Sequence, residues 1–427
     1  MAGGKGTRLR SITNDEIPKP MVPILGKPIL QWQIETLKRE GISNIVLVIG
    51  HLGNRIQEYF QDGSQFGVTI SYFEEKEPLG TAGALAFLSP QLCENDFFLI
   101  FGDVIFDIDL QRMMDYHNQK NAIATLFVHP NTHPYDSDLV VCDSDNKIVK
   151  FDHKNDSRKY WHHNCVNAGF YLMNREICTQ LSKNQKTDLE KELLAGLIKN
   201  QYPVYAYSST EYIKDVGTVE RLKKSEDDLQ NGIVSQRNLK QKQKAIFLDR
   251  DGTINRKNGL IFQENQLELE DEAADAIHKI NDSGYLAIVV TNQPVVARGM
   301  CTIEQLEKIH MKMETLLGNQ GAYLDEICYC PHHPDKGYPE ENPIYKIPCC
   351  CRKPNTGMIE KCVEKYNIDL NQSWMIGDTT VDIQTGKNAN MHTALVLTGD
   401  AGKDHKYSVT ADLVCKNLLE AVEKIIK

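Results

Sequence analysis

The sequence lacks the segments that would place the protein in or across a membrane. It contains no run of about 18 apolar residues, the length at which a stretch becomes a candidate for a membrane-spanning helix. Its N-terminus also lacks the apolar stretch of a secretory signal. We therefore expect a cytoplasmic protein with no membrane partner.

An excess of basic residues is also missing. The 48 Lys and Arg residues are outnumbered by 58 Asp and Glu residues, which gives a formal net charge of −10 at pH 7. A nucleic-acid-binding protein usually carries a basic face, so we expect no nucleic-acid partner. The chain does have length, because 427 residues are enough for about two or three domains.

Short apolar runs alternate with helical patterns in both halves of the chain. The runs lie at residues 42–50, 95–103 and 121–129 in the first half, and at 244–249, 285–292, 373–378 and 393–399 in the second. This alternation is typical of parallel sheets covered by helices on both faces. We predict an α/β fold with two Rossmann-like domains, residues 1–232 and 244–427, joined by a polar linker at 233–243.

The clearest chemical signal is the sequence FLDRDGTIN, in which an apolar run delivers Asp249 and Asp251. Residues at positions i and i+2 of an extended chain lie on the same side, so both carboxylates can face one phosphate. Alone, the pattern is as often a turn at the end of a strand. Three further motifs follow in order, VVTNQ, CRKP and IGDTTVD, and together they favour a catalytic site.

In this order the motifs resemble those of the haloacid dehalogenase-like phosphatases, over residues 244–427. The resemblance implies that Asp249 is the nucleophile and that Asp251 is the general acid and base. It implies that Thr291 and Lys353 hold the phosphoryl oxygens, and that Asp249, Asp251 (through its backbone carbonyl) and Asp378 bind Mg²⁺. The substrate-binding residues implied by the same motifs are Asn292, Gln293, Arg298 and Arg352. A carboxylate can approach a phosphate dianion only when Mg²⁺ and Lys cancel the repulsion.

Half of the twelve cysteines lie between residues 328 and 362. The predicted zinc ligands among them and beside them are Cys330, His332, Cys349 and Cys351. Three thiolates and one imidazole suit a closed, tetrahedral and therefore structural Zn²⁺ site. The alternative is a group of free thiols, as expected in a reducing compartment. In the zinc interpretation, Cys328 and Cys350 are not ligands.

The zinc segment, together with TNQPVVARG and CRKP, resembles the branch that removes the 7-phosphate from D-glycero-D-manno-heptose 1,7-bisphosphate. Relatives that act on histidinol phosphate share the zinc segment and remain the alternative. The heptose branch usually has Ser-Gly-Ile after the Gln, whereas this chain has Pro294-Val295-Val296. This departure leaves the exact substrate open.

The first half, residues 1–232, resembles the sugar-phosphate nucleotidyltransferases. The motifs that carry the resemblance are GGKGTRLRSITNDEIPKPM, EPLGTAGAL, FGD, NAGFYL and KDVGT. It implies that a loop with Gly3, Gly4, Gly6 and Thr7 wraps a nucleoside triphosphate. Arg8 and Lys19 would then neutralise the reacting α-phosphate as the catalytic cations.

The same resemblance assigns a second Mg²⁺ and the remaining contacts of the transferase site. Asp103 and Asp215 would hold the Mg²⁺ across the reacting phosphates. Gly80 would contact the base, Asn167 and Gly169 the sugar. Lys154, in FDHK, would contact the sugar phosphate, although the family more often has Glu-Lys there.

The two predicted activities fit one reaction sequence. Removal of the 7-phosphate leaves a sugar 1-phosphate, which is the substrate that a nucleotidyltransferase needs. The opening motif is most similar to guanylyltransferases for heptose 1-phosphate, so GTP is the favoured nucleotide, for nucleotide-activated heptose in lipopolysaccharide or other surface polysaccharide. The alternative is a sugar or histidinol phosphatase joined to a non-catalytic domain that binds sugar nucleotides. The oligomeric state stays open.

The first strand of the nucleotidyltransferase fold raises a separate question. In the family an apolar strand precedes the AGG motif, and Met1 stands where the last residue of that strand would be. We therefore expect a first domain without its N-terminal strand. Either the true start lies upstream, which we favour, or the domain has lost its activity.

Overall fold

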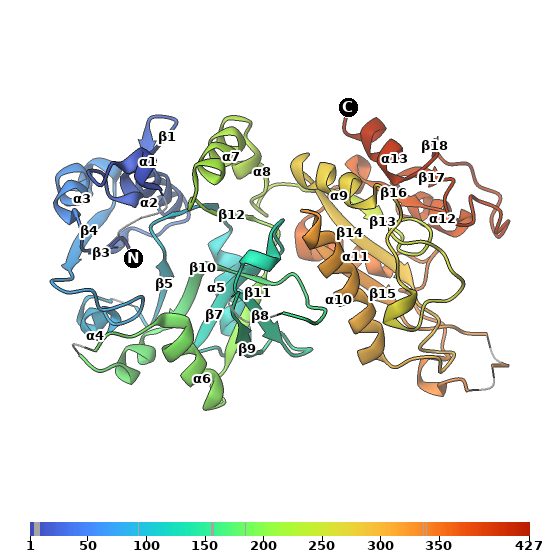
Figure 1. Ribbon diagram of the computed structural model, residues 1–427, viewed down its shortest axis with the longest axis horizontal. Helices are drawn as coiled ribbons and strands as arrows, with labels where there is room; N and C mark the ends of the chain where they lie inside the picture. Colours follow the sequence, from blue (N-terminus) through green and yellow to red (C-terminus); the bar gives the residue numbers. More distant parts are fainter. Residues whose placement is uncertain (4–8, 93, 155–157, 184, 336, 339) are drawn as a thin grey trace. The chain divides into compact units, whose positions relative to one another are not determined.

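The computed structural model describes residues 1–427 except 4–8, 93, 155–157, 184, 336 and 339 (Figure 1). The chain divides into two compact units. The first comprises Met1–Val128, Asp138–His153 and Asn167–Asn238, and the second comprises His129–Ser137, Lys154–Val166 and Leu239–Lys427. Gly4, Gly6, Thr7 and Arg8, which we predicted to bind the triphosphate, lie outside the described residues.

The predicted linker at 233–243 contains the point at which the chain leaves the first unit, after Asn238. Part of this stretch is ordered, because helix α8 (Ile233–Gln236) places Val234 in an apolar cluster of the first unit. Leu239 is buried in an apolar cluster of the second unit. The stretch is polar overall, but it contains two buried apolar residues, Val234 and Leu239.

The first unit is built from short strands and helices. Its strands are β1 (Pro23–Ile24), β2 (Lys27–Pro28), β3 (Asn44–Ile49), β4 (Thr69–Glu74), β5 (Asp96–Ile100), β6 (Val104–Asp107), β7 (Ala124–His129), β8 (Leu139–Cys142), β9 (Ile148–Asp152), β10 (Val166–Asn174), β11 (Val204–Ser208) and β12 (Tyr212–Asp215). Besides α8, its helices are α1 (Arg10–Thr13), α2 (Ile29–Arg39), α3 (Gly53–Phe60), α4 (Leu85–Leu88), α5 (Leu110–Gln119), α6 (Ala195–Lys199) and α7 (Val219–Gln230).

The main sheet of the first unit is mixed. Its strand order is β11-β7-β10-β8-β9, and β5 also pairs with β10. The β11–β7 pair is parallel, whereas β10–β5 and β8–β9 are antiparallel. The α/β class that we predicted is confirmed, with antiparallel pairs added to the expected parallel ones.

Met1 and Ala2 lie between two sheets of the first unit. The Met1 amine donates to the carbonyl of Ile100 in β5 (2.8 Å), and the Ala2 N–H donates to the carbonyl of Val48 in β3 (2.8 Å). The two residues therefore occupy the position between β3 and β5 that the end of a central strand would take. The β3–β4 pair is parallel and forms a separate sheet.

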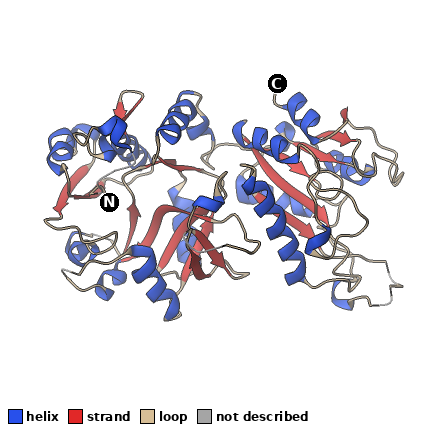
Figure 2. Cartoon of the chain, in the orientation of Figure 1, coloured by secondary structure: helices blue, strands red, loops and turns tan. Residues whose placement is uncertain are grey.

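The second unit contains a fully parallel sheet with the strand order β15-β14-β13-β16-β17-β18. Its strands are β13 (Lys244–Leu248), β14 (Tyr285–Asn292), β15 (Glu326–Cys330), β16 (Trp374–Gly377), β17 (His392–Val396) and β18 (Leu413–Cys415). Its helices are α9 (Ala273–Asp282), α10 (Ile303–Asn319), α11 (Gly357–Tyr366), α12 (Thr380–Asn388) and α13 (Leu418–Ile425). Helices lie on both faces of this sheet (Figure 2).

The alternation of side chains along β13 divides the core of the second unit into two layers. Ile246 and Leu248 pack with residues of α9, α10 and α13. Ala245 and Phe247 point to the other face and pack with residues of α11. A strand buried on both faces needs apolar residues at every position, which explains the continuous run KAIFL.

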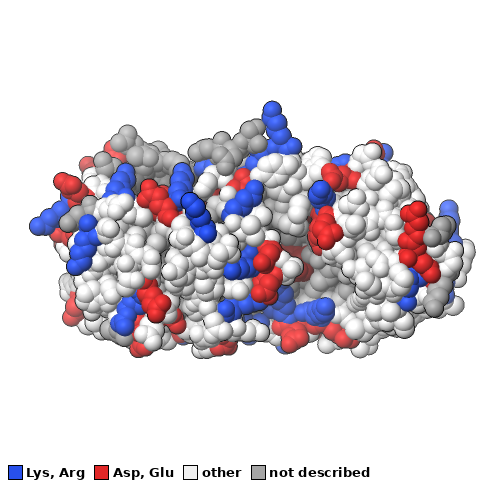
Figure 3. Space-filling model, turned by 90° about the horizontal axis from the view of Figure 1, so that it is seen from below, with Lys and Arg blue, Asp and Glu red and all other residues white. Residues whose placement is uncertain are grey.

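Among the described residues, no helix is long and apolar enough to cross a membrane. Figure 3 shows one face of the molecule, on which basic and acidic side chains are interspersed.

We predict that Phe170 is essential to the core of the first unit. Its ring is fully buried and contacts those of Phe98, Phe106 and Phe127, with centroids 5.7, 4.9 and 6.4 Å away. Phe170→Ala should lower the free energy of unfolding of this unit by about 3–5 kcal/mol, because it removes a large buried side chain and leaves a cavity. The measurement is hydrogen exchange of the amides of β10.

Val149→Ala in β9 provides the control, because Val149 is 55% exposed. Its effect should stay within about 0.5 kcal/mol, as is usual for surface substitutions. Unchanged protection of β10 in Phe170→Ala would contradict the proposed importance of this aromatic cluster.

Candidate functional site

The candidate phosphatase site lies at the carboxyl ends of three parallel strands of the second unit. The strand β13 lies between β14 and β16, so the chain leaves it on opposite sides. Such a switch point opens a crevice beyond the carboxyl ends of the strands. Asp249 follows β13, Thr291 is next to last in β14, and Asp378 follows β16. The strand order therefore brings together residues that are far apart in the sequence.

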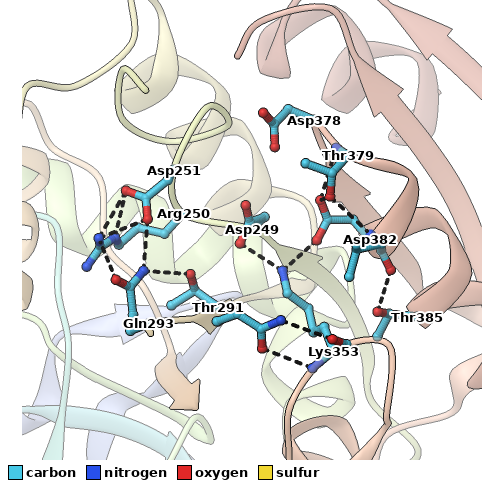
Figure 4. Close-up of polar contacts among 12 residues, drawn as sticks. Asp249, Arg250, Asp251, Thr291, Gln293, Lys353, Asp378, Thr379, Asp382 and Thr385 are labelled. Carbon is cyan, nitrogen blue, oxygen red and sulfur yellow. Dashed lines mark hydrogen bonds and ion pairs between the residues drawn. The ribbon is translucent and has the colours of Figure 1, made fainter. Parts of the chain in front are cut away.

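Three buried carboxylates meet at this crevice. One oxygen from each of Asp249, Asp378 and Asp382 lies within 4.8 Å of the others. The Lys353 Nζ donates to Asp249 Oδ1 (2.7 Å) and to Asp382 Oδ1 (2.5 Å) (Figure 4). A second amine, that of Lys257, lies 3.4 Å from Asp378 Oδ2.

The pKa values of Asp249, Asp378 and Lys353 are all raised. Burial raises the pKa of Asp249 to about 6 and that of Asp378 to about 7, and the neighbouring carboxylates add to the effect. Burial opposes the charge of Lys353, but Asp249 and Asp382 outweigh it and raise the pKa of the ammonium. The site therefore holds more negative charge than its lysines neutralise.

One buried carboxylate oxygen indicates what this group could bind. In the described part of the chain, the buried Asp378 Oδ1 has no hydrogen-bond donor. A hard divalent cation would satisfy this oxygen and cancel the excess charge of the three carboxylates. The group therefore fits Mg²⁺, which prefers carboxylate oxygens.

Asp382 is a functional candidate to which the sequence analysis gave no role. It lies in the first turn of α12, where Thr379 caps the helix and exchanges hydrogen bonds with it. The signal was present in IGDTTVD, because a residue four positions after Asp378 can return to the same edge of the sheet when a helix starts between them. Sequence spacing alone did not show that it would contact Lys353.

The side chain of Asp251 lies away from the three carboxylates (Figure 4). Arg250, which is fully buried, donates to both of its oxygens, and the Nε2 of Gln293 donates to Oδ2 at 2.8 Å. Burial alone would raise the pKa of Asp251, but Arg250 and the hydrogen bonds from Gln293 and Asn255 hold it below its ordinary value. The residue is therefore ionised at neutral pH in this arrangement.

Two predicted substrate-binding residues, Gln293 and Asn292, make hydrogen bonds to catalytic candidates, and their substrate contacts remain predictions. The Nε2 of Gln293 also donates to Thr291 Oγ1 at 3.0 Å, which links the two predicted catalytic residues Thr291 and Asp251. The amide of Asn292 donates to the carbonyl of Lys353 (3.0 Å) and accepts from its N–H (2.9 Å). Both side chains therefore position catalytic candidates.

The four predicted zinc ligands also converge. The Sγ atom of Cys330 lies 3.5 Å from that of Cys349 and 3.2 Å from that of Cys351, which is itself 3.3 Å from Cys349 Sγ. The His332 Nδ1 lies 3.7 Å from Cys330 Sγ and 3.4 Å from Cys351 Sγ. These separations approach the edges of a zinc tetrahedron, about 3.5–3.8 Å for the usual Zn–S and Zn–N distances.

The other cysteines and the two arginines of this region have contacts of their own. Cys350 is exposed, and Cys328 Sγ lies 3.4 Å from Cys362 Sγ, apart from the candidate zinc ligands. The Nη1 of Arg352 donates to the carbonyl of His332 (3.0 Å), and the Arg298 guanidinium lies 4.3 Å from the ring centroid of Tyr338. The substrate contacts predicted for Arg298 and Arg352 remain predictions.

In the first unit, the predicted transferase residues Lys19, Asp103 and Asp215 come together. Lys19 Nζ forms an ion pair with Asp103 Oδ2. The β12–β6 pairing places Asp215 opposite Val104, next to Asp103. The Nη1 of Arg221 donates to both oxygens of Asp215, at 2.6 and 2.7 Å, a contact that the sequence motifs did not reveal.

The expected sugar end of the transferase site contains a partly buried hydrogen-bond network. The amide of Asn167 donates to Glu190 Oε1 (2.7 Å) and to the hydroxyl of Tyr171 (2.8 Å), which in turn donates to Glu190 (3.0 Å). Burial is the main cause that raises the pKa of Glu190. Asp138 and His153 lie within 4.8 Å of Glu190 through one oxygen or nitrogen each.

The backbone conformation at positions 80 and 169 favours glycine. Their φ angles are +83° and +72°, values that favour glycine. A Cβ at Gly80 would lie 2.4 Å from the carbonyl oxygen of Thr187, and one at Gly169 would lie 2.8 Å from the ring of Phe101. The Lys154 Nζ lies 3.6 Å from Asp136 Oδ1. The ligand contacts that we predicted for these residues, and for Gly3, remain predictions.

Comparison with known proteins identifies the first half. The sequence profile named nucleotidyl transferase matches residues 1–232, which is more than half of the chain. The chain belongs to the nucleotidyl transferase family. In addition to this nucleotidyl transferase region, a HAD-hydrolase-like profile matches residues 350–421. Both halves therefore match enzyme families, which confirms the two predicted classes and their order.

Three curated relatives cover the two halves. The D-glycero-beta-D-manno-heptose-1,7-bisphosphate 7-phosphatase of Pasteurella multocida is 40% identical over 158 residues, which are 36% of this chain and 83% of that protein. The D-glycero-alpha-D-manno-heptose 1-phosphate guanylyltransferase of Aneurinibacillus thermoaerophilus is 33% identical over 239 residues, 55% of this chain and 98% of that protein. The UTP--glucose-1-phosphate uridylyltransferase of Synechocystis sp. is 33% identical over 232 residues, 51% of this chain, and the match spans only 59% of that protein.

We predict that the four converging side chains bind one Zn²⁺ per chain, as a site with four protein ligands and no open position. Cys349→Ser should remove most of the zinc and lower the midpoint of thermal unfolding of the second unit, because binding of a structural metal contributes to folding. The measurements are metal analysis of protein purified without chelator and a thermal scan.

Cys350→Ser is the matched control, since Cys350 is the exposed neighbour of two ligands. It should keep the zinc content and the thermal midpoint of the parent. Folded parent protein without zinc would contradict the assignment.

Proposed function

We propose that the protein removes the 7-phosphate of D-glycero-D-manno-heptose 1,7-bisphosphate and transfers a nucleotidyl group, with GMP favoured, to the resulting heptose 1-phosphate. The observation that carries the first activity is the group of Asp249, Asp378 and Asp382 around the amine of Lys353. The second rests on the family membership of the first half and on the meeting of Lys19, Asp103 and Asp215.

In the proposed first step, an oxygen of Asp249 attacks the phosphorus of the 7-phosphate. The new O–P bond forms as the bond to the sugar oxygen breaks, and Asp251 gives its proton to that leaving oxygen. Lys353 and the hydroxyl of Thr291 hold the phosphoryl oxygens. Asp251 is ionised in the unliganded arrangement. The negative charge of the arriving phosphate would raise the pKa of this carboxyl group, which would then take up a proton from solvent before the leaving oxygen departs.

In the proposed second step, a water attacks the phosphorus of the phosphorylated Asp249. Asp251, now ionised again, takes a proton from that water, and the Asp249 carboxylate leaves. The hydrogen bonds from Arg250 and Gln293 keep Asp251 ionised and aimed for this role. The one residue thus serves as the acid and then as the base.

Two metal ions, Mg²⁺ and Zn²⁺, belong to the proposed phosphatase. Mg²⁺ held by Asp249, Asp378 and the backbone carbonyl of Asp251, with Asp382 close by, would supply positive charge against the phosphate. Zn²⁺ held by the three cysteines and His332 would support the loop and do no chemistry. Thiolate ligands need a reducing compartment, and together with the nucleoside triphosphate substrate this favours the cytoplasm.

For the transferase, we propose that a sugar 1-phosphate oxygen attacks the α-phosphorus of the nucleotide and that pyrophosphate leaves. Lys19 would offset the charge of the α-phosphate, and Asp103 and Asp215 would hold a Mg²⁺ that supplies positive charge against the phosphates. In the structure their partners are Lys19 and Arg221, so these cations would turn towards phosphate oxygens when the substrates bind. The carboxyl group of Glu190 and the amide of Asn167 would receive the sugar.

The anomer of the shared intermediate is restricted by the chemistry. Hydrolysis at carbon 7 leaves carbon 1 untouched, so the product keeps the anomer of the bisphosphate. The phosphatase relatives are named for the beta anomer and the guanylyltransferase relative for the alpha anomer. If the two sites share an intermediate, one anomer must serve both. Supplying each bisphosphate anomer with GTP and detecting the nucleotide sugar decides which one.

The alternative to two activities is a sugar or histidinol phosphatase with a first half that only binds nucleotide sugars. Incorporation of labelled nucleotide into heptose 1-phosphate separates the two, because a binding domain gives no labelled product. Comparison of kcat/KM for the heptose bisphosphate and for histidinol phosphate separates the two phosphatase substrates.

We predict that Asp249→Asn abolishes phosphatase activity. Replacement of the nucleophile should lower kcat by about 10⁴-fold or more, as is found when one member of a catalytic unit is removed. The measurement is phosphate release from the sugar bisphosphate. Nucleotidyl transfer should not change, and serves as the internal control.

A second control is Asp271→Asn, because the Asp271 side chain is 87% exposed. It should release phosphate at the rate of the parent. Turnover by Asp249→Asn within tenfold of the parent would rule out Asp249 as the nucleophile.

We predict the opposite pattern for Asp103→Asn. The loss of one metal-binding carboxylate should lower the rate of nucleotidyl transfer by about 100-fold or more, since electrostatic stabilisation by such groups is worth that much. Phosphate release should be unchanged. Asp145→Asn, at a side chain that is 65% exposed, is the matched control. Full transfer activity in Asp103→Asn would support the binding-domain alternative.

A further inference from the structure

A series of polar side chains leads from Asp251 to helix α10. Arg250, which stands between the two predicted catalytic aspartates, is fully buried. Its Nε and Nη2 donate to the Asp251 carboxylate at distances between 2.9 and 3.1 Å (Figure 4). Nη2 also donates to Gln293 Oε1 at 3.0 Å. One edge of the guanidinium therefore holds both the carboxylate and the amide that donates to this carboxylate.

The other end of the guanidinium contacts His310. Arg250 Nη1 lies 3.2 Å from the Nε2 of His310, a side chain that is only 1% exposed. Since an arginine can donate but cannot accept, Nε2 is the acceptor in this contact and the ring proton is on Nδ1. Burial lowers the pKa of His310, and the charge of Arg250 acts in the same direction. Both effects agree with a neutral imidazole.

Glu307 and Tyr329 lie on the far side of this imidazole. Glu307 is one turn earlier on the same face of α10, and its Oε2 lies 3.7 Å from the His310 Nδ1. The Tyr329 hydroxyl donates to Glu307 Oε1 at 2.6 Å, and the Tyr329 ring lies 5.1 Å from the imidazole, measured between centroids. The carboxylate therefore faces the ring nitrogen that carries the proton. This attraction favours the tautomer that accepts from Arg250.

We propose that His310 is a positioning residue for the phosphatase reaction. Through Arg250 it holds the Asp251 carboxyl group in the orientation from which this group gives its proton to the leaving sugar oxygen. The inference rests on the proposed phosphatase mechanism and adds a residue to it.

The physical reason is the satisfaction of a buried donor. Removal of the imidazole takes an acceptor from a buried guanidinium, which costs about 1–3 kcal/mol. A guanidinium that turns towards another acceptor no longer holds Asp251 and Gln293 along one edge. The general acid would then be present but misaligned, and alignment of this kind determines how well a proton is transferred.

The test compares two leaving groups. A sugar alkoxide needs a proton as it departs, whereas nitrophenolate leaves at neutral pH without one, so a misaligned general acid slows only the first. The measurement is release of the leaving group in a single turnover, with the full chain in excess over heptose bisphosphate or over 4-nitrophenyl phosphate. Such a turnover reports phosphoryl transfer to Asp249 and excludes the later attack of water.

His310→Met replaces the imidazole by an apolar side chain of similar size. It should slow release of the sugar from the heptose bisphosphate by about tenfold or more, and release of nitrophenolate by less than about threefold. His310→Gln provides an amide oxygen that can accept from Arg250, so both rates should stay within about threefold of the parent.

The matched control is His392→Met. His392 is exposed and is the first residue of β17, so it lies at the amino ends of the parallel strands, the edge of the sheet opposite to the site. This variant should match the parent with both substrates.

Asp251→Asn, measured in parallel, separates this inference from the mechanism on which it rests. It should show the same selective loss with the heptose bisphosphate. Equal slowing of both substrates in Asp251→Asn would refute the acid role of Asp251, and the positioning role of His310 with it.

Two results would overturn the inference alone. One is a selective loss in Asp251→Asn together with equal rates, or equal slowing of both substrates, in His310→Met, since a purely structural residue affects both reactions alike. The other is a His310→Gln variant as slow as His310→Met with the heptose bisphosphate, which would show that the acceptor at this position does not matter.

Discussion

The buried ammonium of Lys353 is the contact on which the phosphatase site depends. It is hydrogen-bonded to both Asp249 and Asp382, two carboxylates that are far apart in the domain sequence. An uncompensated buried charge costs several kcal/mol. Removing any one of Lys353, Asp249 and Asp382 would therefore destabilise the position of the other two. The parallel sheet makes this possible, because its strand order carries both acids to one edge. Asn292 then holds the backbone of Lys353 in place.

Residues with a local signal were predictable from the sequence. Asp249 and Asp251 follow an apolar run, and Thr291 and Asp378 stand at the ends of others, so their meeting at one edge follows from the α/β pattern. The convergence of Cys330, His332, Cys349 and Cys351 was likewise visible in their types and spacing. The two enzyme classes, their order and the α/β fold are confirmed by the profile matches and the architecture.

Contacts made by side chains across the fold were not predictable in the same way. The amides of Gln293 and Asn292 make hydrogen bonds to Asp251, Thr291 and Lys353, which only the folded chain brings within reach. Arg221 lies after Asp215 on a new helix, and nothing in the helix pattern shows that it turns back to that carboxylate. The antiparallel pairing of β10 with β5 also depends on contacts between distant segments.

The candidate zinc ligands and Lys353 are neighbours in the chain. Cys351 is two residues before Lys353, and Arg352, between them, donates to the carbonyl of His332. Loss of the contacts among the four candidate ligands would therefore loosen the backbone that carries the Lys353 ammonium. A phosphatase built in this way would sense the supply of zinc and the oxidation of its thiols. Removal of phosphate from the sugar would then fall under metal starvation or oxidative stress, together with the stability of the second unit.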